Sequence, residues 1–156
     1  MTHPTLNSSL RGNEPERDPR LNRTALDSDI ASLPLGKVVQ LVAQSEKTWS
    51  RARIARAVLA YRCFLQLARD FQERTIVPSP DADVVWHCAL QDLGPYLAAC
   101  DALFGKPLIH FPWAGLRGAA DAALQRARFA ESSRLLDALV NQVLSTFQSK
   151  RSELKE

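Results

Sequence analysis

Four side chains in the stretch 83–110 are the main candidates for binding a metal ion, and they define the chemistry that this chain could support. They are Asp83, His87, Cys100 and His110. Asp83 and His87 are four residues apart, so on a helix the carboxylate lies one turn from the imidazole and the two can hydrogen-bond. Imidazole, thiolate and carboxylate are the ligands of zinc in proteins. The residue types therefore predict a zinc site built from His87, Cys100 and His110, with Asp83 or Cys88 as the fourth ligand.

The spacing of these ligands places a condition on the fold. On one straight helix, His87 and Cys100 would lie about 20 Å apart along the axis and could not share an ion. The site therefore requires Gly94 and Pro95 to interrupt the helix and fold the chain back, because an interior proline removes a helical hydrogen bond. No C-x-x-C or H-E-x-x-H pattern supports the site locally.

Covalent catalysis is disfavoured by the same spacing. Cys88 follows His87 directly, so on a helix the two side chains point about 100° apart and cannot pair. Cys100 and His110 could meet only through tertiary structure. The chain has no P-loop, G-x-G-x-x-G or G-x-S-x-G motif. We therefore expect a non-catalytic protein, with no cofactor unless the zinc site forms.

The element that must position the acid and the first histidine begins after a double-proline turn. Ser79 is a helix-capping residue, and Pro80 suits the first helical position. Asp81 and Asp83 then fall in the first turn, where negative charge favours the helix dipole. Downstream, Gly105 is the expected left-handed stop of a later helix, and the proline-containing stretch 106–115 that carries His110 reads as a loop.

Hydrophobic periodicity predicts an all-α fold, a single-domain orthogonal helical bundle of about five helices. The expected helices cover about 33–45, 51–74, 80–92, 95–104 and 116–148. The 51–74 helix, capped by Ser50, carries two apolar stripes and is therefore expected to be central. Residues 1–27 read as a disordered tail, residues 28–148 as the helical domain, and residues 149–156 as a frayed charged end.

Composition restricts the class of protein and its location. The 156 residues carry 20 Lys and Arg against 17 Asp and Glu, a net charge of +3, which is too weak for the basic face typical of nucleic-acid binding. The three cysteines lie in apolar segments and read as reduced thiols. No signal peptide and no membrane span are expected. These features indicate a cytoplasmic protein that contacts no membrane.

The 51–74 helix also carries a row of arginines. Arg51, Arg62 and Arg69 fall on one line of the helix. The row is expected to be a solvated edge whose stems lie on the core, with pairing to anions or carboxylates as the alternative. Together with Arg53 and Arg56 it could also support weak nucleic-acid association.

Several ordered motifs in residues 33–147 resemble the glycine-rich domain-containing protein-like family, in its short bacterial form without the glycine-rich tail. They are Tyr61-Arg62-x-Phe64-Leu65, Val77-Pro78-Ser79-x-Asp81-x-Asp83-x-Val85-Trp86-His87, Tyr96-x-x-x-Cys100-x-x-Leu103-Phe104-Gly105, and His110. The resemblance implies a helical fold. The family reads Trp-His-x-His where this chain has Ala89 at the second histidine position. If the family's histidines and cysteine form a site, this member lacks one ligand.

The first functional hypothesis is a protein–protein binding module, an accessory or immunity-type protein whose partner and oligomeric state the sequence does not specify. Its segment 77–113 would form both the core of the fold and the edge of the binding surface. That surface is predicted to contain Arg62, Asp83, Trp86, His87, Tyr96 and Trp113. The alternatives are metal or small-ligand binding at Asp83, His87, Cys100 and His110, with or without hydrolytic chemistry, and weak nucleic-acid binding through the arginine-rich helix.

Overall fold

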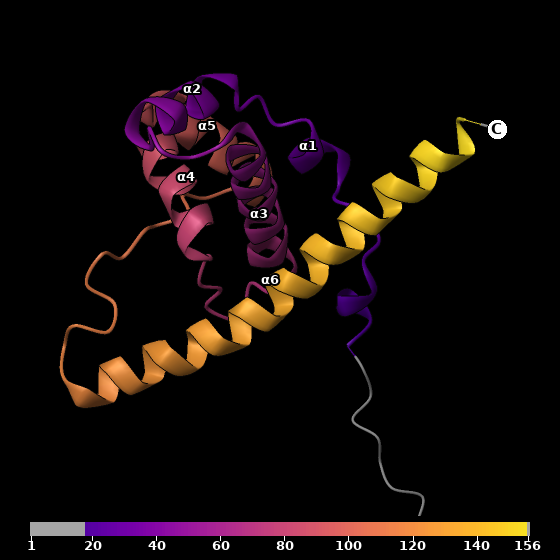
Figure 1. Ribbon diagram of the computed structural model, residues 1–156. Coiled ribbons are helices and arrows are strands. Elements are labelled where there is room, and N and C mark those ends of the chain that lie inside the picture. Colours follow the sequence, from indigo (N-terminus) through magenta and orange to yellow (C-terminus); the bar gives the residue numbers. More distant parts are fainter. Residues whose placement is uncertain (1–17, 156) are drawn as a thin grey trace, which may run out of the picture.

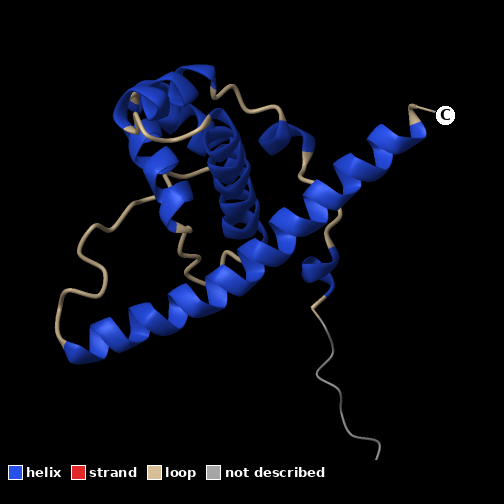
Figure 2. Cartoon of the chain, viewed as in Figure 1, coloured by secondary structure: helices blue, strands red, loops and turns tan. Residues whose placement is uncertain are grey.

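The computed structural model describes residues 18–155, and all regular structure in this part of the chain is helical (Figures 1 and 2). The elements are a 3-10 helix, η1 (Pro19–Asn22), and the α-helices α1 (Ser28–Ala31), α2 (Gly36–Ser45), α3 (Arg51–Asp70), α4 (Pro80–Leu90), α5 (Leu93–Phe104) and α6 (Ala119–Glu153). The all-α helical bundle predicted from the sequence is confirmed.

Helix α3 is the centre of the bundle. It packs against α1, α2, α4 and α6, and Figure 1 shows it standing between α4 and the long α6. Both apolar stripes are buried, with Tyr61 and Leu65 on one and Cys63 and Leu67 on the other. A helix with two apolar stripes must cover both against neighbours, so the central position predicted for this segment is confirmed. The Ser50 hydroxyl caps it by accepting a hydrogen bond from the Arg53 N–H.

Helix α4 begins where the double-proline turn predicts. The Ser79 hydroxyl accepts a hydrogen bond from the Ala82 N–H, and Pro80 occupies the first turn. Two side-chain contacts then fix this start against other helices. The Arg53 guanidinium binds the Asp81 carboxylate through two hydrogen bonds of 3.0 Å, and the buried Ser132 hydroxyl of α6 accepts from the Val77 N–H. The turn is therefore held by both α3 and α6.

Several helix boundaries differ from the predicted ones. Pro34 lies between two helices, α1 and α2, rather than in the first turn of a single helix. Helix α5 begins at Leu93, so Pro95 lies in its first turn, where the missing N–H costs no intrahelical bond. Helix α6 runs to Glu153 rather than ending near Gln148.

Only the middle of α6 belongs to the core. Leu136, Leu139 and Val143 are buried, whereas Leu124 and Phe147 near its two ends are 49% and 62% exposed. A helix of 35 residues is about 50 Å long, which is longer than the face of the bundle that it crosses. Both ends therefore extend past the bundle, as Figure 1 shows. No helix among residues 18–155 combines the length and the apolar character needed to cross a membrane.

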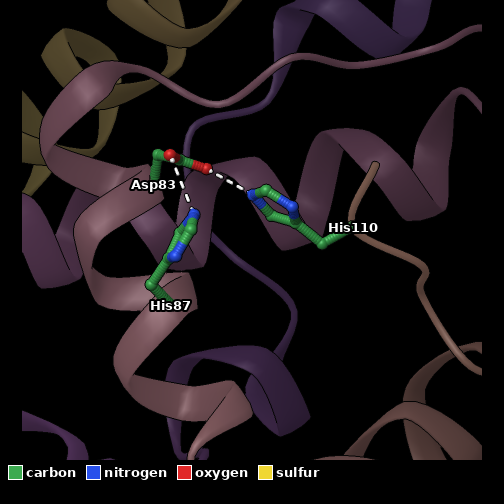
Figure 3. Close-up of side chains that lie close together, drawn as sticks. All are labelled: Asp83, His87 and His110. Carbon is green, nitrogen blue, oxygen red and sulfur yellow. Dashed lines mark hydrogen bonds and ion pairs between the residues drawn. The ribbon is translucent and has the colours of Figure 1, made fainter. Parts of the chain in front are cut away.

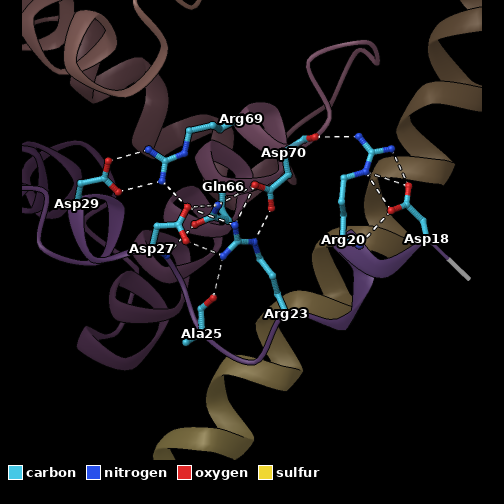
Figure 4. Close-up of polar contacts among 9 residues, drawn as sticks. All are labelled: Asp18, Arg20, Arg23, Ala25, Asp27, Asp29, Gln66, Arg69 and Asp70. Carbon is cyan, nitrogen blue, oxygen red and sulfur yellow. Dashed lines mark hydrogen bonds and ion pairs between the residues drawn. The ribbon is translucent and has the colours of Figure 1, made fainter.

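The predicted N-terminal tail reached residue 27, and this boundary is corrected. Residues 1–17 lie outside the described part of the chain. Residues 18–27 contain η1 and contact α3 through a network of charged side chains (Figure 4). Arg23 binds both Asp27 and Asp70, and Arg69 binds both Asp27 and Asp29. The sequence showed little apolar periodicity here because a charged network attaches the segment, and Leu26 is the residue of 18–27 that packs against the hydrophobic core.

Candidate metal centre

Three of the predicted ligands converge on one point of the structure (Figure 3). The Nε2 atom of His110 lies 2.9 Å from one oxygen of Asp83, and the Nε2 atom of His87 lies 3.3 Å from the other. One ligand atom from each of the three residues lies within 4.8 Å of the other two. The two imidazole rings meet edge to face, with 4.5 Å between their centroids. We refer to these three residues as the Asp83 centre.

Asp83 and His87 come together through local structure. Both lie on α4, one helical turn apart, so the helix alone sets their separation. The predicted pairing of this acid with this imidazole is confirmed. His110 is 27 residues from Asp83 along the chain and reaches it only through the loop after α5.

A chain of contacts directs that loop toward α4. Gly105 ends α5 in the left-handed conformation, with φ of 67°, as predicted. The Tyr96 hydroxyl accepts a hydrogen bond from the Trp86 indole N–H and donates one to the Leu108 carbonyl. His110, two residues later, packs edge to face against Trp86 with 4.6 Å between ring centroids. Burial raises the pKa of Tyr96, so this hydroxyl keeps the proton that it donates to the loop.

The Asp83 centre is partly open to solvent. The side chain of His87 is 55% exposed and that of Asp83 is 39% exposed, whereas that of His110 is 16% exposed. Beside it lies a pocket of about 720 Å³, lined by the turn before α4, the loop 109–114 and the first turns of α6. Asp83 and His110 form part of the pocket wall. A ligand in the pocket would therefore meet the Asp83 centre directly.

The two cysteines proposed as ligands do not take part. The group that the structure brings together contains neither Cys88 nor Cys100, and both thiols are 2% exposed in the core. The sequence held the signal for Cys100, because it shares one helix face with Tyr96 and Leu103, and all three are buried. For Cys100, its place on an apolar helix face was a better guide to its burial than its residue type was to metal binding.

The predicted binding surface is corrected in the same way. Trp86 and Tyr96 are 5% and 7% exposed and pack inside the bundle. The Arg62 guanidinium donates to the Ile30 and Leu33 carbonyls at the end of α1, at 2.5 and 2.8 Å, and burial lowers its pKa. These three side chains hold the fold together. His87, Trp113 and, in part, Asp83 are exposed as predicted.

The arginines of α3 are largely engaged within the protein. Arg53 pairs with Asp81, Arg62 caps α1, and Arg69 binds Asp27 and Asp29. For Arg62 and Arg69, the expected solvated row is in fact a row of contacts to carbonyl and carboxylate groups. Within residues 18–155, Arg51 and Arg56 form no ion pair. Of the five arginines predicted as a possible nucleic-acid surface, these two are therefore the ones that make no side-chain hydrogen bond or ion pair within the described residues.

Arg128 and Phe129 on α6 were not identified from the sequence, although both line the pocket. No local motif marks them, since their position depends on how α6 crosses the bundle. Comparison with protein-family models, curated proteins and solved structures finds no match for this chain. The resemblance to the glycine-rich domain-containing protein-like family stays a prediction.

Proposed function

We propose that this protein is a small binding domain that holds a divalent transition metal, zinc first among them, between Asp83, His87 and His110. The observation that carries the proposal is that these three donor groups lie within 4.8 Å of one another. Zinc binds carboxylate oxygen and imidazole nitrogen at about 2.0–2.2 Å, so donor atoms at this separation can share one ion after small side-chain rotations. Two histidines and one carboxylate are also a known ligand set for iron(II).

The surroundings of the Asp83 centre support a binding role. Zinc sites with three protein ligands keep a fourth position open for a small molecule, and here the pocket wall contains Asp83 and His110. No arginine or lysine among residues 18–155 forms an ion pair with Asp83, whose ion-pair partners there are the two histidines. An imidazole nitrogen can bind a metal ion beside the carboxylate, whereas a guanidinium has no lone pair with which to bind one. When bound, the ion would act as an acceptor for an electron-pair donor in the pocket.

Isothermal titration of chelator-treated protein with zinc tests the proposal. We expect one equivalent to bind to the wild-type chain, and His87→Ala and His110→Ala each to weaken binding by more than about tenfold, since even outer-sphere partners contribute that much. Cys100→Ala is the matched control, because the thiol lies outside the Asp83 centre, and it should bind zinc as the wild type does. Equal zinc affinity in the wild type and both histidine variants, or loss of binding in Cys100→Ala alone, would refute the proposed site.

A second candidate function, recognition of another protein, is favoured by the loop that carries His110. Ile109, Phe111, Trp113 and Leu116 are each at least 60% exposed. Exposed aromatic side chains that lie together are typical of contact surfaces. Trp113 was predicted as part of the binding surface, and its contact with a partner remains a proposal. A specific partner should be captured from the native host by the wild-type chain and lost with Phe111→Ser/Trp113→Ser, whereas Leu154→Ser, an exposed leucine at the far end of α6, should retain it.

A further inference from the structure

The pocket beside the Asp83 centre has the composition of a small-molecule site. Its volume of about 720 Å³ falls within the range of about 300–1,000 Å³ usual for ligand pockets. Val77 and Trp86 contribute apolar surface on the side of α4, and Phe111, Trp113 and Phe129 contribute it from the loop and α6. A flat apolar or aromatic group would therefore be covered on several sides.

The two arginines of the pocket wall differ in whether they already have hydrogen-bond partners within the protein. The Asp121 carboxylate accepts hydrogen bonds from the Gly115 and Arg117 N–H groups and from the Arg117 guanidinium, which lower its pKa. Arg117 is therefore already paired. Arg128 is half-buried and lines the same pocket, yet within residues 18–155 its guanidinium forms neither an ion pair nor a hydrogen bond. It is the cation of this wall with donors left for a ligand.

We propose that the pocket binds a small organic carboxylate with an apolar body, its carboxylate on Arg128 and its body against Phe129 and Trp113. A guanidinium presents parallel N–H donors that match the two oxygens of a carboxylate. The wall carries two arginines and two aspartates, and Arg117 and Asp121 neutralise each other. Asp83 is paired with the two histidines of the Asp83 centre, so Arg128 is the one guanidinium of the wall that is left for a ligand, and a single guanidinium matches a monoanion better than a phosphate dianion. This inference rests on the proposed function in one respect only, that the bound carboxylate would lie next to a metal ion.

The test compares three probes on the full chain, first treated with chelator and then loaded with zinc. Phenylacetate has both the charge and the body, phenylacetamide lacks the charge, and acetate lacks the body. Binding is followed by calorimetry and by the fluorescence of Trp113 and its neighbours. In chelator-treated protein we expect phenylacetate to bind at least about tenfold more tightly than either other probe, because the charged hydrogen bonds and the apolar contacts each contribute at least this factor.

Arg128→Gln and Arg126→Gln form the matched pair of variants. Arg126 lies two residues away on the same helix, is exposed, and does not line the pocket. Arg128→Gln should weaken phenylacetate binding by about tenfold to a hundredfold, and Arg126→Gln should leave it unchanged. If both variants unfold at the same temperature as the wild type, a loss of binding in Arg128→Gln does not reflect misfolding.

The outcomes separate this inference from the metal proposal. Equal binding of phenylacetate and phenylacetamide, or wild-type affinity in Arg128→Gln, overturns the carboxylate site. Phenylacetate binding that appears only after zinc loading and does not depend on Arg128 also overturns it, since the carboxylate would then be on the metal. If zinc fails to bind while phenylacetate binds through Arg128, the metal proposal fails and the carboxylate site stands.

Discussion

Two polar clusters in this protein differ in the basic side chains that surround their carboxylates. In the network that attaches residues 18–29 to α3, Asp27, Asp29 and Asp70 are bound by guanidinium groups (Figure 4). In the Asp83 centre, a single carboxylate lies between two imidazoles (Figure 3). The first cluster joins an N-terminal segment to the central helix, and the second joins α4 to a loop. In both clusters, aspartate side chains hold distant parts of the chain together.

The two clusters differ in whether their basic side chains can bind anything other than the carboxylate. A guanidinium is always charged and offers only donors, so a carboxylate bound to Arg23 or Arg69 is committed to that contact. An imidazole has a ring nitrogen that accepts a metal as readily as a proton. The arginine network is therefore a structural contact, whereas the ring nitrogens of the Asp83 centre are the groups that we propose bind an ion together with Asp83. Gln66, buried between Asp27 and Asp70 and bonded to both, further fixes the arginine network.

Zinc affinity should show the largest difference between the two clusters. We expect Asp83→Asn to weaken zinc binding by more than about a hundredfold, because it removes a direct ligand, whose loss costs more than that of an outer-sphere partner. Asp70→Asn in the arginine network should leave the zinc affinity unchanged. Calorimetric titration of both variants measures this contrast. Comparable losses in the two variants would mean that the Asp83 centre is not the binding site.

Stability should respond in the opposite order. Asp70 accepts hydrogen bonds from Arg23 and Gln66, and its side chain is 12% exposed. Asp70→Asn should therefore lower the free energy of unfolding by about 2 kcal/mol, the usual contribution of a hydrogen bond to a charged group. Asp83→Asn, at a carboxylate that is 39% exposed, should cost less than about 1 kcal/mol. Urea denaturation of the metal-free variants gives both values, and a costlier Asp83→Asn would reverse the assignment of roles.

Substitution at two glycines should change stability in opposite directions. Gly105 has a φ of 67°, and an added Cβ would meet nothing within 4 Å. Gly105→Ala should therefore cost about 1 kcal/mol through backbone strain alone, at the turn that sends the loop back toward Asp83. Gly36, at the start of α2, also has open space and an ordinary φ, so Gly36→Ala should stabilise the chain by about 0.4–1 kcal/mol, because alanine restricts the unfolded chain more than glycine does. Thermal denaturation separates the two signs.

The smallest expected effect is the loss of stability at low pH that comes from Asp27 in the arginine network. Hydrogen bonds, first of all from Arg23, lower the pKa of Asp27 from 3.8 to about 2. Because the pKa is lower in the folded state, this carboxylate stabilises the protein fully above about pH 4 and loses its contribution as the pH falls through about 2. Asp27→Asn should make the unfolding free energy fall less steeply between pH 4 and pH 2. An unchanged slope, measured by urea titration at several pH values, would contradict the shift.

Part of the candidate site could be predicted because local geometry produces it. The Ser79 cap, the proline after it and the four-residue spacing of Asp83 and His87 act within one or two turns of helix. The left-handed stop at Gly105 is equally local. Cys100 was misassigned because its ligand chemistry outweighed its place on an apolar face. Burial makes a thiol harder to ionise, and a metal ligand must be a thiolate. Another cysteine of this core shows the effect, since burial raises the pKa of Cys63 to about 12.

What the sequence by itself determined is the all-α fold, the central role of α3 and the acid–imidazole pair on α4, since hydrophobic period and helix caps are short-range properties. Residue type made His110 and Cys100 equal candidates, and tertiary structure decided that His110 joins this pair and Cys100 does not. It also decided that Arg128 lines the same pocket and that residues 18–27 bind α3. Each of these contacts joins residues far apart in the sequence: Asp83 and His110 are 27 residues apart, and Arg23 and Asp70 are 47 residues apart. Such contacts depend on the path of a loop and the crossing of two helices, which no local pattern encodes.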